Sequence, residues 1–505
     1  MKKYVCIHGH FYQPPRENPW TGEVDEEPSA SPFHDWNERI AKECYEANTR
    51  APILNAKGET SACLNNFEYI SFDIGPTLLS WLKRKSPTAY QSILEADRVS
   101  VAGHRGHGNA MAQIYNHLIM PLAKKRDKLT QVLWGIADFE YHYQRKPEGL
   151  WLSEAAVDRE TLKILADNGI LYTVLAPHQA LRVRKIGFAR RWDNVGHENI
   201  DFKRAYRVLL EGGKQFHVFF YDAPVARGIA FQGLLNSGDQ LVHQLANGYG
   251  RGDAPQLVST ATDGESFGHH HKFGEMALAY ALKKIQDQKQ MQLTNYGEFL
   301  ELTGSDWEVD IKENSSWSCA HGVERWRSDC GCRLNHEMHW NQKWRTVLRE
   351  ALEVLQDSVD AVFVQQMDGV LKDPWQARND YIQVILDPSE KQKRTFLAQH
   401  CRRGVTDEKK VWDLLEAQKF ALFMFTSCGW FFDDISGIEP VQLLKFALRA
   451  IELVQPYDKK DLEGTLVKAL SRAKSNIPGN GTGADVFENF VKPAKHRTAG
   501  VIHGV

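Results

Sequence analysis

The chain has 505 residues, of which 42% are hydrophobic, 25% charged and 11% aromatic. This balance is typical of a folded globular protein of about two to four domains, and it excludes a largely disordered chain. Lys and Arg (62) nearly balance Asp and Glu (64), and no block of like charges stands out, so the sequence predicts neither nucleic-acid nor membrane-surface binding.

The N-terminal stretch and the cysteines indicate where the protein works. MKKYVCIHGHFYQPP has two lysines but only a short apolar run before His8, whereas a secretory signal needs a longer apolar core. Nowhere is there a run of about 18 apolar residues that would predict a transmembrane helix. The 8 cysteines are too few for a disulfide scaffold in so long a chain and are typical of a reducing compartment. We therefore expect a cytoplasmic enzyme or a large binding protein.

Short apolar runs recur through roughly the first 300 residues and predict strands. They are residues 4–7, 99–102, 149–152, 170–175, 217–221 and 257–261. Helical patterns lie between them: apolar residues from Asp127 to Tyr143 fall on one face, and Asp158 and Gly169 are typical of the two ends of another helix. Repeated strand–helix–strand units predict a parallel sheet or barrel.

Polar and ionisable residues follow most of these predicted strands. In chain order they are His8 and His10, His104 and His107, Ser153 and Glu154, His178, Asp222, and Asp263 with Glu265. A β/α barrel builds its active site at the carboxyl ends of many strands, whereas a doubly wound sheet does so only at its switch point. The spread over many strands therefore favours a barrel over 1–300.

The pattern changes after residue 300. Residues 301–340 are rich in Trp, Cys and His with little periodicity, and we expect a loop at the active site there. Helical patterns follow in 341–475, marked by residues 344–359, by 411–422 with Asp407 as cap, and by 440–453. The segment 476–505, with its PGNGTGA run, predicts loop and tail. The expected organisation is thus a barrel, an active-site loop region, an α-helical domain and a tail.

Two carboxylates have contexts that suit catalysis. Glu154 lies in GLWLSEAAVD and Asp263 in STATDGESFGHHH, each directly after a predicted strand. Glycoside hydrolysis needs one carboxylate to attack or stabilise the anomeric carbon and another to carry a proton for the leaving oxygen. Either residue alone is more often a helix cap or an ion-pair partner, but the two strand-to-loop contexts together favour catalysis.

Histidines and cysteines form two further groups. His8 and His10 lie on one side of a strand end, and His269 starts a run of three histidines after Asp263; metal ligation, sugar binding and core hydrogen bonding all remain open for them. The second group is Cys319, His321, Cys330, Cys332, His336 and His339. Its spacing is not that of the usual zinc fingers or ribbons, so free thiols are favoured and a structural metal is the alternative.

Four tryptophans stand in or near the same region and are candidates for stacking on sugar rings. They are Trp317, Trp326, Trp340 and Trp430. Aromatic faces complement the C–H surfaces of sugars, although any single tryptophan is more often a packing residue.

Several short motifs, in order along roughly the first 330 residues, resemble those of glycoside hydrolase family 57. That family acts on α-glucans and includes 4-α-glucanotransferases, branching enzymes, amylopullulanases and α-amylase-like proteins. HGHFYQP is similar to its first motif and IYNHLIMPL to its second. GLWLSEAAVD and TDGESFG resemble the two catalytic motifs, and ENSSWSCAHGVERW resembles a later one. The cysteine-rich loop and SCGWFFDD (427–434) resemble those of a poorly characterised subgroup.

The resemblance implies an incomplete (β/α)7 barrel followed by a helical domain, and a retaining double-displacement mechanism with no metal or other cofactor. It implies Glu154 as nucleophile and Asp263 as acid/base. Because Phe11 and Tyr12 interrupt the first motif, His8 and His10 are both candidates for it. The expected substrate-binding residues are His8, His10, Gln13, His117, Trp151, His269, Trp317 and Trp430.

Three functions follow, in order of preference. The first is a retaining hydrolase or transglycosylase whose substrate is an α-glucan or oligosaccharide. The second is a metal-dependent carbohydrate deacetylase or an α-mannosidase-like hydrolase, suggested by the histidines. The third is a glucan-binding protein without activity, in which the tryptophans bind the sugar.

Overall fold

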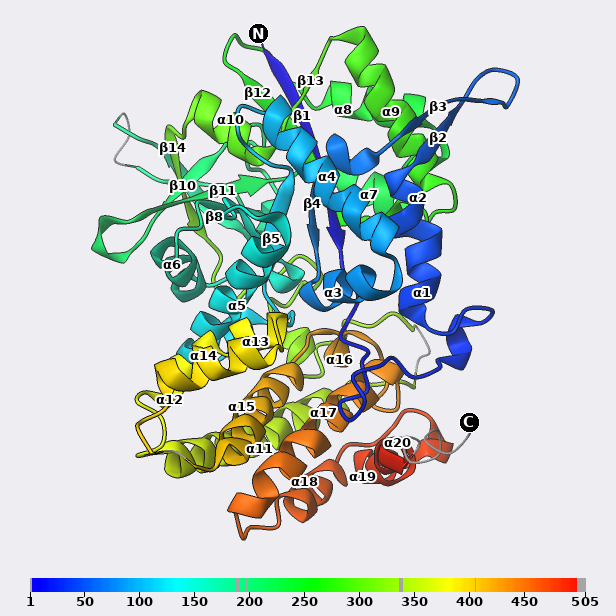
Figure 1. Ribbon diagram of the computed structural model, residues 1–505. Helices are drawn as coiled ribbons and strands as arrows, with labels where there is room; N and C mark the ends of the chain where they lie inside the picture. The colour runs from blue at the N-terminus through cyan, green and yellow to red at the C-terminus, as the bar shows by residue number, and fades with distance from the viewer. Residues whose placement is uncertain (1, 188–190, 197, 336–338, 405, 497–505) are drawn as a thin grey trace. The chain divides into compact units, whose positions relative to one another are not determined.

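The computed structural model describes residues 2–187, 191–196, 198–335, 339–404 and 406–496 (Figure 1). The chain forms two compact units, and both are assembled from separate stretches of sequence. The first, called the barrel unit below, comprises Met1–Gln13, Glu26–Tyr115 and Phe139–Trp317. The second, called the helical unit, comprises Pro14–Asp25, Asn116–Asp138 and Ser318–Val505.

Parallel strands form the core of the barrel unit. They are β1 (Lys3–Phe11), β4 (Ser71–Ile74), β5 (Ala110–Gln113), β6 (Leu150–Trp151), β7 (Tyr172–Leu175), β11 (Gln215–Phe220) and β12 (Gln256–Asp263). The order β12-β1-β4-β5-β6 is continuous, a parallel bridge from Gly149 to Tyr172 leads on to β7, and β7 pairs with β11. The Asp222 N–H, just after β11, donates to the Ser259 carbonyl of β12 at 2.7 Å. This is the incomplete (β/α)7 barrel that the sequence predicts.

Shorter strands extend this core. β13 (Gln292–Leu293) pairs with β1, and β2 (Ala51–Leu54) forms a hairpin with β3 (Thr60–Leu64). Next to β11 the sheet continues through β10 (Tyr206–Leu209), β14 (Trp307–Ile311), β8 (Ala180–Lys185) and β9 (Asp193–Asn194). The prediction of a loop over 301–340 is therefore wrong at Trp307–Ile311, which forms β14.

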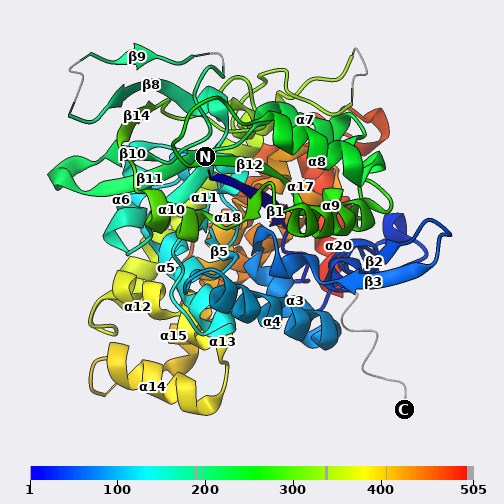
Figure 2. The same cartoon turned by 90° about the horizontal axis from the view of Figure 1, so that it is seen from above.

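Helices cover the strands of the barrel unit (Figure 2). They are α1 (Trp36–Ile40), α2 (Glu46–Thr49), α3 (Pro76–Lys85), α4 (Pro87–Gly103), α6 (Arg159–Asp167), α7 (Ala223–Phe231), α8 (Gly238–Asn247), α9 (Gly274–Gln288) and α10 (Tyr296–Thr303). The predicted ends of α6 are confirmed: the Asp158 carboxylate accepts the Thr161 N–H at 2.7 Å, and Gly169 has a φ of +85°.

One predicted strand is wrong. Residues 99–102 belong to α4, because the buried residues of this segment recur at helical spacing through Tyr90, Ile93, Ala96, Asp97 and Ser100. A window of four apolar residues is too short to distinguish a strand from one turn of a buried helix.

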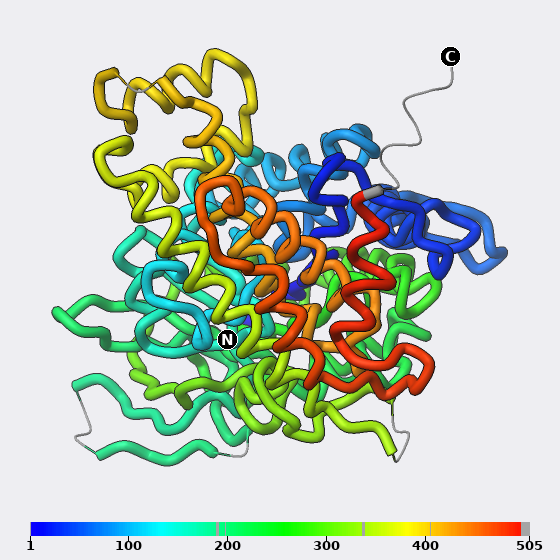
Figure 3. The backbone as a smooth tube through the Cα atoms, turned by 90° about the horizontal axis from the view of Figure 1, so that it is seen from below, coloured from blue at the N-terminus to red at the C-terminus, as the bar shows by residue number. Residues whose placement is uncertain are grey.

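Helices make up the helical unit, whose C-terminal part is drawn in orange and red in Figure 3. They are α11 (Trp344–Met367), α12 (Pro374–Asp380), α13 (Ile382–Leu386), α14 (Glu390–His400), α15 (Glu408–Phe423), α16 (Cys428–Phe431), α17 (Ile438–Val454), α18 (Leu462–Leu470), α19 (Gly483–Val486) and α20 (Lys492–His496). The predicted cap Asp407 accepts the Lys410 N–H at 3.1 Å. No helix in the described part of the chain has both the length and the apolarity needed to cross a bilayer.

The prediction of loop and tail for 476–505 is wrong where α19 and α20 lie. Thr482 and Asp485 form a reciprocal cap at the start of α19. The Val486, Phe487 and Val491 side chains then bury an apolar face. The glycine-rich run before residue 482 predicts a loop, and the apolar pattern of the helices that follow it is too short to outweigh that signal.

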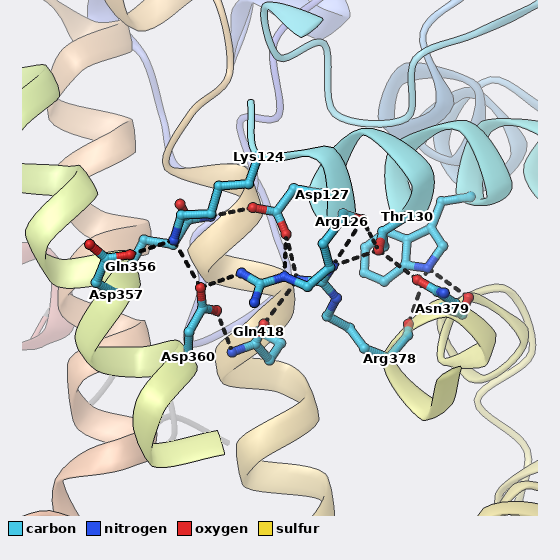
Figure 4. Close-up of polar contacts among 11 residues, drawn as sticks. Lys124, Arg126, Asp127, Thr130, Gln356, Asp357, Asp360, Arg378, Asn379 and Gln418 are labelled. Carbon is cyan, nitrogen blue, oxygen red and sulfur yellow. Dashed lines mark hydrogen bonds and ion pairs between the residues drawn. The ribbon is translucent and has the colours of Figure 1, made fainter. Parts of the chain in front are cut away.

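Helix α5 (Lys125–Tyr143) begins in the helical unit, where buried polar contacts fix it (Figure 4). Asp127 accepts a hydrogen bond from Arg378 of α12 at 2.7 Å, and both side chains are buried. Arg378 also donates to the Thr130 hydroxyl at 2.7 Å. Gln418 of α15 donates to Asp360 of α11 at 3.1 Å in the same cluster. The start of α5 is therefore a structural part of the helical unit, although it lies far from the other helices in sequence.

Candidate active site

The pairing of β12, β1 and β4 brings three ionisable residues together at their carboxyl ends. His10 of β1 is in register with Asp263 of β12 on one side and with Asp73 of β4 on the other. Registered residues of neighbouring strands point to the same face of a sheet. Gln113 of β5 and Trp151 of β6 are paired in the same way. Strand register thus places these five residues, called the floor of the site below, at the carboxyl edge where β/α barrels have their active sites.

Asp73 is the centre of this floor. Its buried carboxylate accepts hydrogen bonds from His8 Nε2 at 3.0 Å, His10 Nδ1 at 2.8 Å and Gln113 Nε2 at 2.6 Å. Burial raises the pKa of a carboxyl group, but the charge and hydrogen bond of His10, together with His8, lower the pKa of Asp73 overall. Asp73 is therefore ionised and fixes both rings. The sequence does not predict Asp73, because Ser71 and Asp73 interrupt the apolar run of the short strand SFDI.

His8 and Trp151 support the site from behind, which corrects the expectation that they contact substrate. The two ring nitrogens of His8 bind Ser71 and Asp73, each at 3.0 Å, and burial lowers the His8 pKa. Trp151 is fully buried and stacks on His8, with ring centroids 4.7 Å apart. A neutral, buried imidazole whose nitrogens face the protein holds its neighbours in place rather than a sugar. Substrate binding by His10 stays a prediction.

His10 is a buried cation. Burial lowers its pKa, but the charge and hydrogen bond of Asp73, and the charges of Asp263 and Glu265, outweigh this and raise the pKa to about 9. Its ring stacks between Tyr12 and Trp151, with centroid distances of 5.7 and 5.2 Å. At neutral pH the site therefore holds an imidazolium next to Asp263.

Asp263 and Glu265 bring two carboxyl groups to the end of β12. The Asp263 side chain reaches solvent, but the protein around it still desolvates the carboxyl group and raises its pKa, against the effect of His10. Glu265 is buried and accepts hydrogen bonds from the Tyr45 hydroxyl at 2.5 Å and the Tyr12 N–H at 3.0 Å. Burial, with the charge of Asp263, raises the Glu265 pKa to about 7. Glu265 lies in the TDGESFG motif, but the Tyr45 residue that binds its carboxyl group is 220 residues away in sequence.

Glu154 is held in an unusual backbone conformation after β6. It has a φ of +56°, and the next residue, Ala155, has a φ of +47°. Residues other than glycine in this left-handed region cost about 1–3 kcal/mol each and are concentrated at functional sites. Trp317 holds the residue twice: its backbone N–H donates to the Glu154 carbonyl and its indole N–H donates to Oε2, each at 3.0 Å. The Trp317 ring also lies edge-on to His10, at 6.0 Å between centroids. Trp317 therefore contacts both Glu154 and His10, and His10 is in register with Asp263.

Two other expected binding residues lie in the barrel unit. Gln13 is buried just after β1 and donates to the Tyr12 carbonyl at 3.0 Å. His269 is tied to the site through its backbone N–H, which donates to the Glu265 carbonyl at 3.0 Å, while its ring binds Glu43 at 2.5 Å. Their substrate contacts stay predictions.

His117 and Trp430 belong to the helical unit. The buried His117 ring binds the Ser427 hydroxyl at 2.7 Å. Trp430 is fully buried, donates to the Arg345 carbonyl at 3.2 Å and has the Arg349 guanidinium 4.2 Å from its ring centroid. Trp430 is therefore a packing residue, and the prediction that it stacks on sugar is wrong because the ring has no exposed face.

His104 and His107 are not at the active edge, because the strand predicted before them is part of α4. They lie between α4 and the amino end of β5. His104 binds Glu298 at 2.7 Å and His107 binds Glu148 at 2.9 Å, so both make ion pairs at the opposite end of the strands.

Within the described residues, one group could hold a metal ion: Cys319, His321, Cys330 and Cys332 of the helical unit. His336 lies outside the described residues. The predicted zinc candidate His339 is described but does not join the group.

Two family models match the sequence. Glycosyl hydrolase family 57 matches residues 10–312, and a domain of unknown function, DUF3536, matches residues 340–503. No curated protein matches the sequence.

Solved structures show the same fold. An exo-type maltose-forming amylase from Pyrococcus sp. ST04 is 17% identical, with a TM-score of 0.71 over 98% of this chain and 88% of the amylase. The 4-α-glucanotransferase of Thermococcus litoralis is 17% identical, with a TM-score of 0.55 over 91% of this chain and 61% of that enzyme. A branching enzyme of Thermococcus kodakaraensis is 14% identical, with a TM-score of 0.54 over 98% and 96%.

The first family model spans more than half of the chain, from His10 at the end of β1 to the segment after β14. It therefore includes every part of the barrel unit that carries His10, Asp73, Glu154 and Asp263. The resemblance inferred from the motifs is confirmed, and the chain belongs to glycosyl hydrolase family 57.

Proposed function

We propose that the protein is a retaining hydrolase or transglycosylase acting on α-glucans, with Glu154 as nucleophile and Asp263 as acid/base. The observation that carries the proposal is the pair of unlike carboxyl environments at the carboxyl ends of β6 and β12. Glu154 accepts an indole N–H at 3.0 Å, which stabilises its ionised form, whereas desolvation raises the pKa of Asp263. A double displacement needs one carboxylate that attacks the anomeric carbon and one carboxyl group that carries a proton for the leaving oxygen.

The first step would cleave the glycosidic bond. Asp263 gives its proton to the glycosidic oxygen while a Glu154 carboxylate oxygen attacks the anomeric carbon, so that the leaving chain departs as an alcohol and a glycosyl ester of Glu154 remains. Asp263 is then an anion, and the adjacent His10 imidazolium stabilises it. In the second step Asp263 takes a proton from water or from an acceptor sugar hydroxyl, which displaces Glu154.

The substrate class rests on the family and on the solved structures with this fold, which include an amylase, a glucanotransferase and a branching enzyme. The metal-dependent alternative loses support because the His8 nitrogens face Ser71 and Asp73. We also propose that the protein works in the cytoplasm, as the 8 cysteines of the sequence predict.

Product analysis tests the assignment. Wild type, Glu154→Gln and Asp263→Asn are incubated with soluble α-1,4-glucan and with maltooligosaccharides, and chain lengths, branch linkages and the first anomer released are followed by chromatography and NMR. Wild type is expected to give new chain lengths or branches with retained α-configuration, and Glu154→Gln should lose roughly 10³-fold or more of the rate. Glu160→Gln, an exposed position on α6, is the control and should behave as wild type.

A nitrophenyl α-maltooligoside separates the two carboxyl groups. Nitrophenolate leaves without a proton, so Asp263→Asn should lose much less of its bond-cleavage rate on this substrate than the 10²–10⁴-fold typical of a missing general acid. Glu154→Gln should be equally inactive on both substrates. Full activity of Glu154→Gln, or an inverted product, would contradict the assignment.

A further inference from the structure

Four metal-ligating side chains of the helical unit converge in the segment that follows Trp317. The Cys319 Sγ lies 3.9 Å from the Cys330 Sγ and 3.7 Å from the Cys332 Sγ, and the Cys332 Sγ lies 3.6 Å from the His321 Nδ1. All four donor atoms lie within 4.8 Å of one another. These sulfurs are not bonded to each other, since a disulfide joins its sulfurs at about 2.05 Å.

Three of the six separations match the edges of a tetrahedron around a small metal ion. Zn²⁺ binds thiolate sulfur at about 2.3 Å and imidazole nitrogen at about 2.0–2.1 Å, which gives edges of about 3.8 Å between sulfurs and about 3.6 Å between sulfur and nitrogen. The three measured edges of 3.9, 3.7 and 3.6 Å fit these values. Three cysteines and one histidine are also a usual donor set for structural zinc.

The backbone is shaped to aim the four side chains at one point. Gly331, between two of the cysteines, has a φ of +85°, a conformation that lets the chain reverse so that Cys330 and Cys332 face the same centre. The Gly322 N–H donates to the Cys319 carbonyl at 3.1 Å and closes a tight turn around His321.

Buried arginines fix the same backbone from outside. Arg345, fully buried in α11, donates to the Cys332 carbonyl at 2.8 Å. Arg325, also buried, donates to the Ser318 carbonyl at 3.1 Å. Such contacts hold metal-binding loops in position and are a common part of metal sites.

We propose that Cys319, His321, Cys330 and Cys332 bind one Zn²⁺ ion, and that the ion holds residues 318–335 against α11. Four protein ligands close a tetrahedral site, so the ion has a structural rather than a catalytic role. The segment has little regular structure besides a short 3-10 turn over Glu324–Trp326, although the Trp326 side chain is fully buried and its carbonyl accepts from Arg349 of α11. Because few backbone hydrogen bonds of regular structure hold this loop, a bound zinc ion would add much to its stability. The proposal is independent of the reaction proposed above and replaces the expectation of free thiols.

Metal analysis of the full-length protein tests this. The chain is purified without a histidine tag and without chelators, and elemental analysis is expected to find one zinc per chain. Cys330→Ser and Cys332→Ser should lose that zinc, whereas Cys63→Ser, an exposed cysteine of the barrel unit, should keep it. Protein without stoichiometric metal, zinc that survives both substitutions, or a disulfide among these cysteines found by mass spectrometry would overturn the proposal.

A conservative variant guards against simple misfolding. His321→Cys keeps four donors and should retain one zinc, because four thiolates also bind zinc tetrahedrally. After exchange with Co²⁺, wild type should show the intense visible bands of tetrahedral cobalt and thiolate charge-transfer absorption, and His321→Cys should increase the latter. Octahedral cobalt spectra, or equal charge-transfer intensity in the two proteins, would reject this ligand set.

Discussion

The charge at the candidate active site is set by close neighbours of His10. Asp73 holds the ring through Nδ1 at 2.8 Å, and Asp263 is registered beside it. The carboxyl groups and the imidazolium each shift the protonation of the others, so single substitutions should move the pH dependence of the reaction in directions that can be given in advance.

Removing the positive charge of His10 should move the basic limb of activity upward. The imidazolium lowers the Asp263 pKa, so in His10→Gln that pKa rises and the general acid stays protonated to higher pH. The expected result is a lower kcat/KM with its decline on the alkaline side displaced to higher pH. Profiles of kcat/KM against pH check this, and an alkaline limb displaced to lower pH would contradict the assigned charge.

Removing the carboxylate of Glu265 should have the opposite sign. The Glu265 pKa of about 7 means that it ionises as pH rises through neutrality, and its negative charge then opposes ionisation of Asp263. Glu265→Gln should therefore move the alkaline limb to lower pH. Profiles of kcat/KM against pH test this as well. If the alkaline limbs of His10→Gln and Glu265→Gln shifted in the same direction, the assigned charges of His10 and Glu265 could not explain the shifts.

At the scale of elements, the sequence predicts the apolar strands and misses the polar ones. β1 and β12 are buried on both faces and contain the apolar runs 4–7 and 257–258, which give a strand signal. β4 and β5 escape because their buried positions include Ser71, Asp73 and Gln113, which are polar for the sake of the site. Glu154 and Asp263 are candidates from the sequence because each lies in a local motif directly after a strand. Asp73 acts through partners 40 to 65 residues away and Tyr45 through one 220 residues away, which no local pattern encodes.

The contact between α5 and α12 offers a test of stability. Arg378→Met removes the buried guanidinium from Asp127. The Asp127 carboxylate then keeps Arg126 at 3.2 Å and Gln356 at 3.1 Å. Breaking a buried pair costs about 3–5 kcal/mol of the free energy of unfolding, so we expect a loss of up to about that size. Lys163→Met, which removes a half-exposed pair with Asp167 within α6, should cost less than about 1 kcal/mol. Urea denaturation measures both. Equal losses in the two variants would show that the Arg378 contact adds nothing by being buried.

At the scale of the whole chain, the helical unit needs segments that lie outside its C-terminal half. The Trp20 indole donates to Glu452 at 2.7 Å, and the Asn116 amide donates to the Leu422 carbonyl at 2.7 Å. DUF3536 matches only from residue 340, but the unit also contains Pro14–Asp25 and Asn116–Asp138. The sequence could not predict this, because the first half of α5 has the same helical pattern whichever unit it packs in.

A fragment of residues 318–505 should therefore fail to fold cooperatively. It lacks Asp127, Trp20 and Asn116, so Arg378, Glu452 and the Leu422 carbonyl lose these buried or half-buried hydrogen bonds. We expect weak near-UV circular dichroism and fast amide exchange in α11, α12 and α15 of the fragment, compared with the same helices in the full chain. Addition of a peptide of residues 116–138 should restore part of the protection. A sharp, cooperative thermal transition of the fragment alone would contradict this.

Because the helical unit is built from segments far apart in sequence, its parts leave the ribosome at different times. Asp127 and Arg378 are 251 residues apart, so at about 5–20 residues per second the arginine is made roughly 12–50 s after the aspartate. The first part of α5 must pass that interval exposed, while the strands from β6 to β12 are still being added. The pace of translation, rather than the intrinsic rate of helix packing, therefore decides how long the start of α5 waits for its partner.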